Sequence, residues 1–181
     1  MDCWPREDKE TLYKCVKRLE RRDPDHRLFG TNKGKNIGYE WLTVRETLEK
    51  SRHFAAGAQA LGLVPEVTGE GGAIWRFLGI QSKNRVEWML AHWADFHIGV
   101  CTVALYDTLG VAAFRYIVSQ TELITIACSG DFVAKIAQYK LDDDPNAPKL
   151  SKLKYLVTFD TIADPAVQQK LSDAGLTLYT F

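Results

Sequence analysis

The polar side chains best placed for chemistry lie at two turns, each between an apolar run and a helical pattern. The stretch Tyr106-Asp107-Thr108 follows the apolar run 100–105 and precedes a helical pattern. An earlier turn, Ser82-Lys83-Asn84, follows another apolar run in the same way. A phenol, a carboxylate and a hydroxyl at the end of a buried strand can orient a ligand through hydrogen bonds. Tyr106, Asp107 and Thr108 are therefore candidates for a substrate crevice, and no residue is predicted to be catalytic.

Helix capping explains the same residues without a ligand. Asp107 or Thr108 would accept a hydrogen bond from an amide in the first turn of the following helix, while Tyr106 covers the sheet edge. In the earlier turn, the Asn84 side chain would cap the next helix. Glu87, at the third position of that helix, would accept a hydrogen bond from the Asn84 amide. From the residues alone, both interpretations remain open.

The residues that position these turns have the pattern of an open α/β sheet. Short apolar runs rich in β-branched and aromatic residues lie at 75–81, 101–106, 122–128, 154–159 and 176–181. Helical patterns alternate with them, at 85–98, 110–119, 131–139 and 165–173. This alternation predicts right-handed crossovers and an α/β fold, doubly wound, with a mostly parallel sheet and helices on both faces. Both polar turns then lie at the carboxyl edge of the sheet, where such folds bind ligands.

Two regions are predicted: a helical and extended lead-in over 1–73, and a βαβ-repeat portion over 74–181. The lead-in begins with a helix over 9–22, which Asp23-Pro24-Asp25 ends because proline cannot continue it. The helix is predicted from one apolar stripe at helical spacing, made of Leu12, Cys15, Val16 and Leu19.

The rest of the lead-in contains an extended piece, a capped helix and a loop. Residues 39–42 are predicted to be extended. Thr43 and Glu46 have the spacing of a capping box, which predicts a helix from there to about Gly62. Residues 65–72 are predicted to form a flexible acidic loop.

Composition excludes several classes of function. Basic and acidic residues balance at 23 each, so the chain has no overall electrostatic attraction to nucleic acid or to an anionic membrane. No apolar run approaches the ~20 residues that cross a bilayer, and residues 1–8 lack a signal-peptide pattern. The chain is expected to be soluble and intracellular.

The four cysteines have no C-x-x-C spacing, which predicts free thiols in a reducing compartment. Cys101 and Cys128 fall within apolar runs and are expected to behave as small buried hydrophobic groups.

Motifs for phosphates, metals and acyl hydrolysis do not match. Residues 30–36 lack the spacing of a phosphate loop, and the glycines of 69–72 precede a strand instead of opening a helix. The histidines have no ligand spacing, and the adjacent aspartates of 142–144 point in different directions, so no metal site is predicted. A G-x-S-x-G elbow is also absent.

Several segments together resemble the start of the adenylation domain of long-chain fatty acid–CoA ligases, members of the adenylate-forming, AMP-binding superfamily. The matching words are Gly38-Tyr39-Glu40-Trp41-Leu42-Thr43, Phe77-Leu78-Gly79-Ile80, Ser82-Lys83-Asn84-Arg85-Val86-Glu87-Trp88, Leu105-Tyr106-Asp107-Thr108-Leu109-Gly110 and Tyr116-Ile117-Val118. The resemblance runs from about residue 11 to the end. Ala104 departs from it, because the long-chain branch usually has proline there.

This resemblance implies a parent reaction in which fatty acid and ATP give an acyl-adenylate, followed by thioester formation with CoA. ATP, Mg²⁺ and CoA are therefore implied for a full-length member. The family's phosphate loop, its later nucleotide-binding motifs and its C-terminal lysine do not occur within 1–181. The segment is thus expected to be inactive alone and to bind none of these groups tightly. The family also implies a cytosolic location or a peripheral one on endoplasmic reticulum, mitochondrial or peroxisomal membranes.

Three hypotheses follow from these observations. The first is an N-terminal portion of a long-chain fatty acid–CoA ligase. The second is a naturally short, non-catalytic binding or assembly module derived from that domain. The apolar run 176–181 would leave an unpaired strand edge, which predicts missing chain or a protein partner there. The third is a domain that binds a small ligand in the Tyr106/Asp107 crevice.

Overall fold

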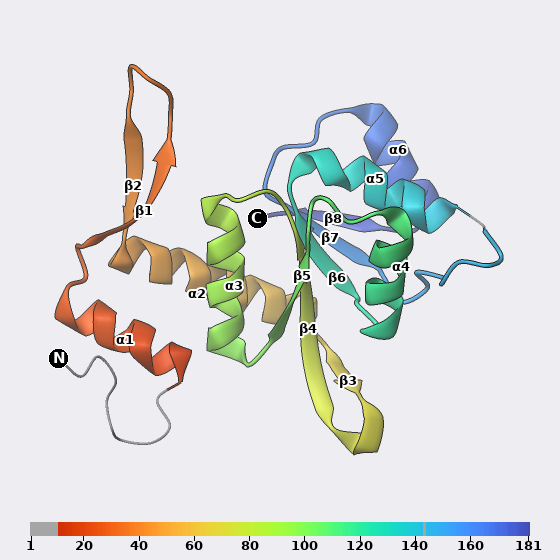
Figure 1. Ribbon diagram of the computed structural model, residues 1–181, viewed down its shortest axis with the longest axis horizontal. Helices are drawn as coiled ribbons and strands as arrows, with labels where there is room; N and C mark the ends of the chain where they lie inside the picture. Colours follow the sequence, from red (N-terminus) through yellow and green to blue (C-terminus); the bar gives the residue numbers. More distant parts are fainter. Residues whose placement is uncertain (1–10, 143) are drawn as a thin grey trace.

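The computed structural model describes residues 11–142 and 144–181, and it shows an α/β body from which β-hairpins project (Figure 1). The parallel sheet has the order β5-β4-β6-β7-β8. Its strands are β4 (Ile74–Gln81), β5 (Cys101–Leu105), β6 (Thr125–Cys128), β7 (Tyr155–Thr158) and β8 (Thr177–Thr180). The predicted parallel sheet is confirmed. Its order reverses between β4 and β6, which makes that boundary a topological switch point.

Helices cover both faces of this sheet, as the apolar pattern predicts. One face packs on α4 (Val111–Gln120), α5 (Gly130–Leu141) and α6 (Pro165–Asp173), and Phe114, Val133 and Leu171 belong to its buried core. The other face packs on α2 (Val44–Ala60) and α3 (Val86–Ile98), with Ala58 and Ala91 in the second core. The fold is therefore doubly wound (Figure 1).

The lead-in consists of α1 (Leu12–Arg22), β1 (Arg27–Asn32), β2 (Tyr39–Thr43) and α2. The capping box before α2 is confirmed, because Thr43 Oγ1 accepts from the Glu46 amide and the Glu46 carboxylate accepts from the Thr43 amide at 2.8 Å. Strand β1 has no sequence signal of its own. It forms because it pairs antiparallel with β2, and Gly30 lets the Trp41 ring lie against the backbone.

The prediction of a flexible loop over 65–72 is wrong. Residues Glu66–Thr68 form β3, which pairs antiparallel with the start of β4, and Glu70–Gly72 form a short 3₁₀ helix, η1. Gly71 and Gly72 both have positive φ, a backbone region that side chains other than glycine rarely adopt. The glycines therefore make the turn of a hairpin instead of a loose connection.

Two cysteine predictions have different outcomes. Cys128 is fully buried in β6, and this burial raises the pKa of its thiol. Cys101 is exposed, because it opens β5 at the edge of the sheet, so the expectation of burial is wrong there.

Cys3, the pattern over 1–8 and Asp143 of the aspartate run lie outside the described residues. In the described ranges no helix is long and apolar enough to cross a membrane.

Candidate functional site

The two polar turns lie together at the carboxyl edge of the sheet, around a crevice between β4 and β5. This β4–β5 crevice has a volume of about 330 Å³. Ser82, Asn84 and Trp88 line it from one side, and Tyr106 and Asp107 line it from the other. Residue 108, the third candidate, belongs to the same turn but is not among the described residues that line the crevice. The fold thus brings together two of the three sequence-predicted residues.

The capping interpretation of these turns is wrong. Helix α4 begins after Gly110 and α3 begins after Arg85, and neither N-terminus is capped by a side chain of the described residues. The 106–109 segment forms a turn of its own, closed by a hydrogen bond from the Leu109 amide to the Tyr106 carbonyl at 3.1 Å. This turn moves the start of α4 away from Asp107, and it leaves Tyr106 69% exposed.

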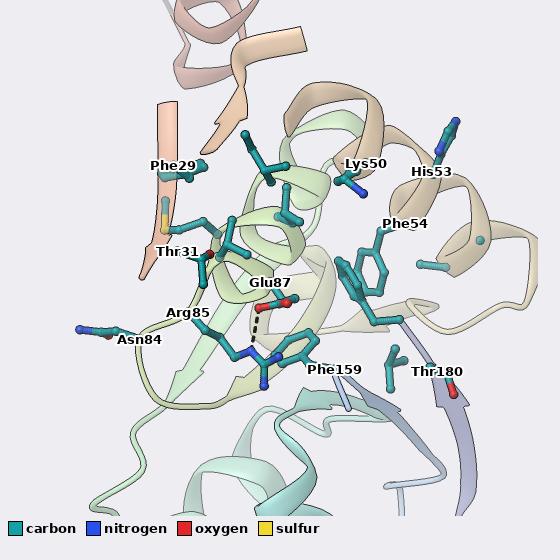
Figure 2. A pocket seen from close by; sticks show the side chains of 18 of the residues that line it. Phe29, Thr31, Lys50, His53, Phe54, Asn84, Arg85, Glu87, Phe159 and Thr180 are labelled. Carbon is teal, nitrogen blue, oxygen red and sulfur yellow. Dashed lines mark hydrogen bonds and ion pairs between the residues drawn. The ribbon is translucent and has the colours of Figure 1, made fainter. Parts of the chain in front are cut away.

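A larger cavity, the hairpin cavity, lies beside the crevice and has a volume of about 1180 Å³. It is bounded by the β1–β2 hairpin, α2, the start of α3 and the ends of β7 and β8, and Asn84 lines both cavities. Its walls combine basic and aromatic side chains, including Lys50, His53, Arg85, Phe54 and Phe159 (Figure 2). The lead-in therefore forms one wall of this cavity.

Arg85 is the centre of the polar network in the hairpin cavity. Its Nε lies 2.7 Å from a carboxylate oxygen of Glu87 (Figure 2), and its Nη1 lies 2.9 Å from both carboxylate oxygens of Asp160. The guanidinium carbon is also 5.5 Å from the centroid of the Phe159 ring, within range of a cation–π interaction. The hydrogen bond with Glu87, together with the one to Asp160, outweighs burial and raises the pKa of Arg85.

Asp160 caps the start of α5 from a segment that lies further along the chain. Its carboxylate accepts a hydrogen bond from the Gly130 amide, the first of α5, at 2.7 Å. Burial acts to raise the pKa of Asp160, but the Gly130 amide and the Arg85 guanidinium outweigh it and hold the pKa below its ordinary value. Sequence reasoning missed this residue, although a carboxylate directly after the apolar run 154–159 was an available signal.

The switch point itself is marked by Gln81, at the end of β4. Its carbonyl accepts from the Ser129 amide, which follows β6, at 3.2 Å. Its side chain is 2% exposed, and its Oε1 has no hydrogen-bond partner among the described residues. Gln81 lies at the switch point because β4 and β6 are neighbours in the sheet but are not consecutive in the chain.

The side chains of this edge do not fit ATP with Mg²⁺. Within 11–142 and 144–181 no group of three or more His, Cys, Asp and Glu side chains could hold a metal ion. The amide at the start of α5, where a phosphate would bind, already donates to Asp160. In the aspartate run, the carboxylate of Asp142 pairs with Arg115 instead. We therefore assign none of the described residues to nucleotide or metal.

Comparison with known proteins identifies the wider context of this fold. Residues 17–176 match the family model of the AMP-binding enzymes. Fatty acyl-CoA synthetase B of Dictyostelium discoideum is 30% identical over 175 residues, which are 94% of this chain and 24% of that protein. Human long-chain-fatty-acid–CoA ligase 1 is 30% identical over 90% of this chain and 22% of its own length. The chain thus spans about a quarter of the length of these relatives.

Solved structures agree on the fold. The adenylation domain of a carboxylate reductase from Mycobacterium chelonae superimposes with a TM-score of 0.72 at 17% identity, over 97% of this chain and 28% of that one. A structure described as a putative long-chain-fatty-acid CoA ligase from Rhodopseudomonas palustris gives a TM-score of 0.64 at 18% identity, over 96% and 39% of the two chains. By sequence and by fold, this chain belongs to the AMP-binding enzyme family, and its curated relatives are long-chain fatty acid–CoA ligases that it matches over an N-terminal portion.

Proposed function

We propose that this chain forms the N-terminal part of a long-chain fatty acid–CoA ligase and is inactive by itself. The whole enzyme would form an acyl-adenylate from fatty acid and ATP, and then an acyl-CoA thioester. The observation that carries this proposal is the match to fatty acyl-CoA synthetases along 87–94% of this chain but only 22–24% of theirs.

The chemistry of adenylation supports the proposal that this chain is inactive by itself. Phosphoryl and adenylyl transfer require cations and backbone amides directed at the phosphate oxygens. The best-placed cation in the described part of this chain, Arg85, is already held by two carboxylates, Glu87 and Asp160. The segment would therefore supply the sheet, the β4–β5 crevice and one wall of the hairpin cavity, while other residues of the enzyme bind ATP, Mg²⁺ and CoA.

Within this frame, Tyr106, Asp107 and Thr108 are proposed to border a substrate crevice of the complete enzyme. The first two already line the β4–β5 crevice, and Thr108 lies in the same turn. An intracellular location, cytosolic or peripheral on a membrane, is proposed with it on the basis of the family. Fractionation of cells that produce the protein tests the location.

The decisive experiment compares residues 1–181 with the product of the same reading frame continued beyond codon 181. Both are supplied with a labelled long-chain fatty acid, ATP, Mg²⁺ and CoA, and the acyl-CoA product is measured. Thioester formation is expected only from the longer product. Calorimetry on 1–181 is expected to show no tight binding of ATP, CoA or fatty acid.

Two results would overturn parts of this proposal. Acyl-CoA formed by 1–181 alone would disprove that the segment is inactive. An in-frame stop at codon 181, with no phosphate loop encoded downstream, would disprove the ligase proposal. The alternative, a short non-catalytic binding or assembly module, would then be supported by a monodisperse, cooperatively folded protein that binds one specific partner.

A further inference from the structure

A chain of three polar side chains connects α3 to the edge strand β5, away from the Arg85 network. The Nδ1 atom of His92 lies 2.8 Å from Thr102 Oγ1. The same hydroxyl is hydrogen-bonded to Oδ2 of Asp95. Asp95 is 1% exposed, and its other oxygen, Oδ1, has no hydrogen-bond partner among the described residues. A buried carboxyl is thus connected to an imidazole through a single hydroxyl.

The geometry of a hydroxyl makes this arrangement directional. Thr102 has one hydrogen to donate, so it can donate to Asp95 or to His92 but not to both. If Asp95 is ionised, Thr102 must donate to the carboxylate, and His92 must donate to Thr102 from a protonated Nδ1. If Asp95 carries a proton, it can donate to Thr102, which then donates to His92. In that case Nδ1 accepts, and the neutral ring carries its hydrogen on Nε2.

We propose that Asp95, Thr102 and His92 form a proton-responsive relay in which one proton taken up by Asp95 reverses both hydrogen bonds and switches the tautomer of His92. Solvent supplies a proton at Nε2, while the Nδ1 hydrogen passes to Thr102 Oγ1 and the Thr102 hydrogen passes to Asp95 Oδ2, so three bonds to hydrogen form and two break, with a net gain of one proton. Through this relay, the protonation state of the buried Asp95 carboxyl determines the tautomer of the His92 ring. It is independent of the ligase function proposed above.

The surroundings of Asp95 favour proton uptake near neutral pH. Burial raises the pKa of Asp95 to about 7, against the smaller opposing effect of the Thr102 hydroxyl. The unpaired Oδ1 acts in the same direction, because an unsatisfied buried oxygen costs more free energy when it carries charge. Burial also lowers the pKa of His92, so the ring is neutral where Asp95 titrates. Burial thus favours the neutral form of both groups.

Other charged groups that pack on α3 act elsewhere on the helix. Lys17 and Glu20 of α1 and Arg52 of α2 affect the pKa of His97, not that of Asp95. At the start of the helix, Glu87 is paired with Arg85.

The charged side chains of the strands beside α3 pair with partners other than Asp95. Arg76 of β4 pairs with Glu66 of β3, Lys33 directly after β1 pairs with Glu40 of β2, and Cys101 of β5 is exposed. Among the described groups, burial and Thr102 account for the pKa shift of Asp95.

The relay also lies next to the β4–β5 crevice. The His92 ring is 5.4 Å from the Trp88 ring and 4.8 Å from the Phe96 ring, centroid to centroid. Trp88 is a wall of the crevice, and β5, which carries Thr102, leads directly into Tyr106. A change of tautomer at His92 therefore occurs against a side chain that lines the crevice.

Nitrogen-15 NMR of the imidazole rings in 1–181 tests the relay, because the two neutral tautomers have distinct Nδ1 and Nε2 resonances. From about pH 8 to about pH 6, the dominant neutral tautomer of His92 is expected to change from Nδ1–H to Nε2–H. A tautomer of His92 that does not change over this range would overturn the proposal.

Matched variants separate the relay from a structural role. Thr102→Val removes the hydroxyl and is expected to abolish the tautomer change, whereas Thr102→Ser keeps it. Asp95→Asn can neither take up nor release a proton, so the pH-dependent tautomer change of His92 is expected to disappear in this variant. A tautomer change that persists in Thr102→Val, or that is lost equally in Thr102→Ser, would contradict the relay even if one variant folds poorly.

Discussion

Arg85 and Asp160 lie 75 residues apart in the chain, yet Nη1 of Arg85 is 2.9 Å from both carboxylate oxygens of Asp160. The contact joins the turn after β4 to the segment after β7, across the carboxyl edge of the sheet. Because Asp160 also accepts from the Gly130 amide, the start of α5 is held in the same network. The carboxyl edge is thus braced by one arginine, and this network is open to direct test.

Replacing Arg85 with methionine removes the cation from this network but keeps an unbranched, apolar side-chain stem. We expect a loss of about 1–3 kcal/mol in the free energy of unfolding, measured in urea, because two partly buried carboxylates lose their partner. Arg76→Met is the matched control, since its pair with Glu66 is largely exposed and surface pairs contribute about 0–1 kcal/mol. Equal effects of the two substitutions would contradict the bracing role of Arg85.

At Asp160, the cap and the charge can be separated by two substitutions. Asp160→Ala removes the acceptor for the Gly130 amide and is expected to cost about 1 kcal/mol, whereas Asp160→Asn keeps an acceptor. Because the pKa of Asp160 is lowered in the folded state, its ionised form contributes stability above its unfolded pKa, and this is lost as pH falls through the folded pKa. Asp160→Asn should flatten that acid limb in unfolding curves below about pH 4. An unchanged acid limb would contradict this assignment.

A buried arginine, Arg115, holds the loop after α5. It is 2% exposed, and it donates to the carbonyls of Tyr139 and Asp142 at 2.5 and 3.0 Å and to the Asp142 carboxylate at 2.9 Å. Arg115→Met is expected to cost about 3 kcal/mol, because it removes a buried guanidinium that donates to two main-chain carbonyls and a carboxylate. Asp142→Asn should cost less than about 1 kcal/mol, since the carbonyl acceptors remain. Hydrogen exchange should increase at the end of α5 only in the arginine variant.

Two glycines should respond to alanine in opposite directions. A Cβ at Gly79 in β4 would lie 3.0 Å from side-chain carbons of Ile126 and Leu123, so Gly79→Ala is expected to cost about 1–3 kcal/mol through overpacking. A Cβ at Gly57 in α2 would meet nothing within 4 Å, so Gly57→Ala should gain about 0.5–1 kcal/mol through helix propensity. Thermal unfolding measures both, and the same sign for both would contradict the packing around β4.

The buried carboxyl of Asp95 should make the stability of the wild type depend on pH. Its pKa is raised from 3.8 to about 7 in the folded state, so the stabilisation present below the unfolded pKa is lost as pH rises through the folded pKa. We expect the free energy of unfolding to fall by about 2–4 kcal/mol between about pH 4 and about pH 7. The amide of Asp95→Asn cannot ionise, so this part of the slope should disappear. An identical slope in both proteins would show that Asp95 is not the titrating group.

The sequence was sufficient for the elements whose signals are local. Alternating apolar runs and helical patterns predicted the parallel sheet, its helices on both faces and the polar turns at its carboxyl edge. The capping box at Thr43 and Glu46 depends on residues three apart, and it forms as predicted. Such features could be predicted because propensity and periodicity act within a few residues.

Tertiary structure alone decided how distant segments meet. Strand β1 exists because β2 pairs with it, and α5 is capped by Asp160, which lies 30 residues further along the chain. The switch point at Gln81 depends on β4 lying beside β6, and the contact of Asp95 with Thr102 depends on α3 packing against β5. These relationships follow from hydrogen bonding and packing between segments far apart in sequence, and no local pattern of residues encodes which segments become neighbours.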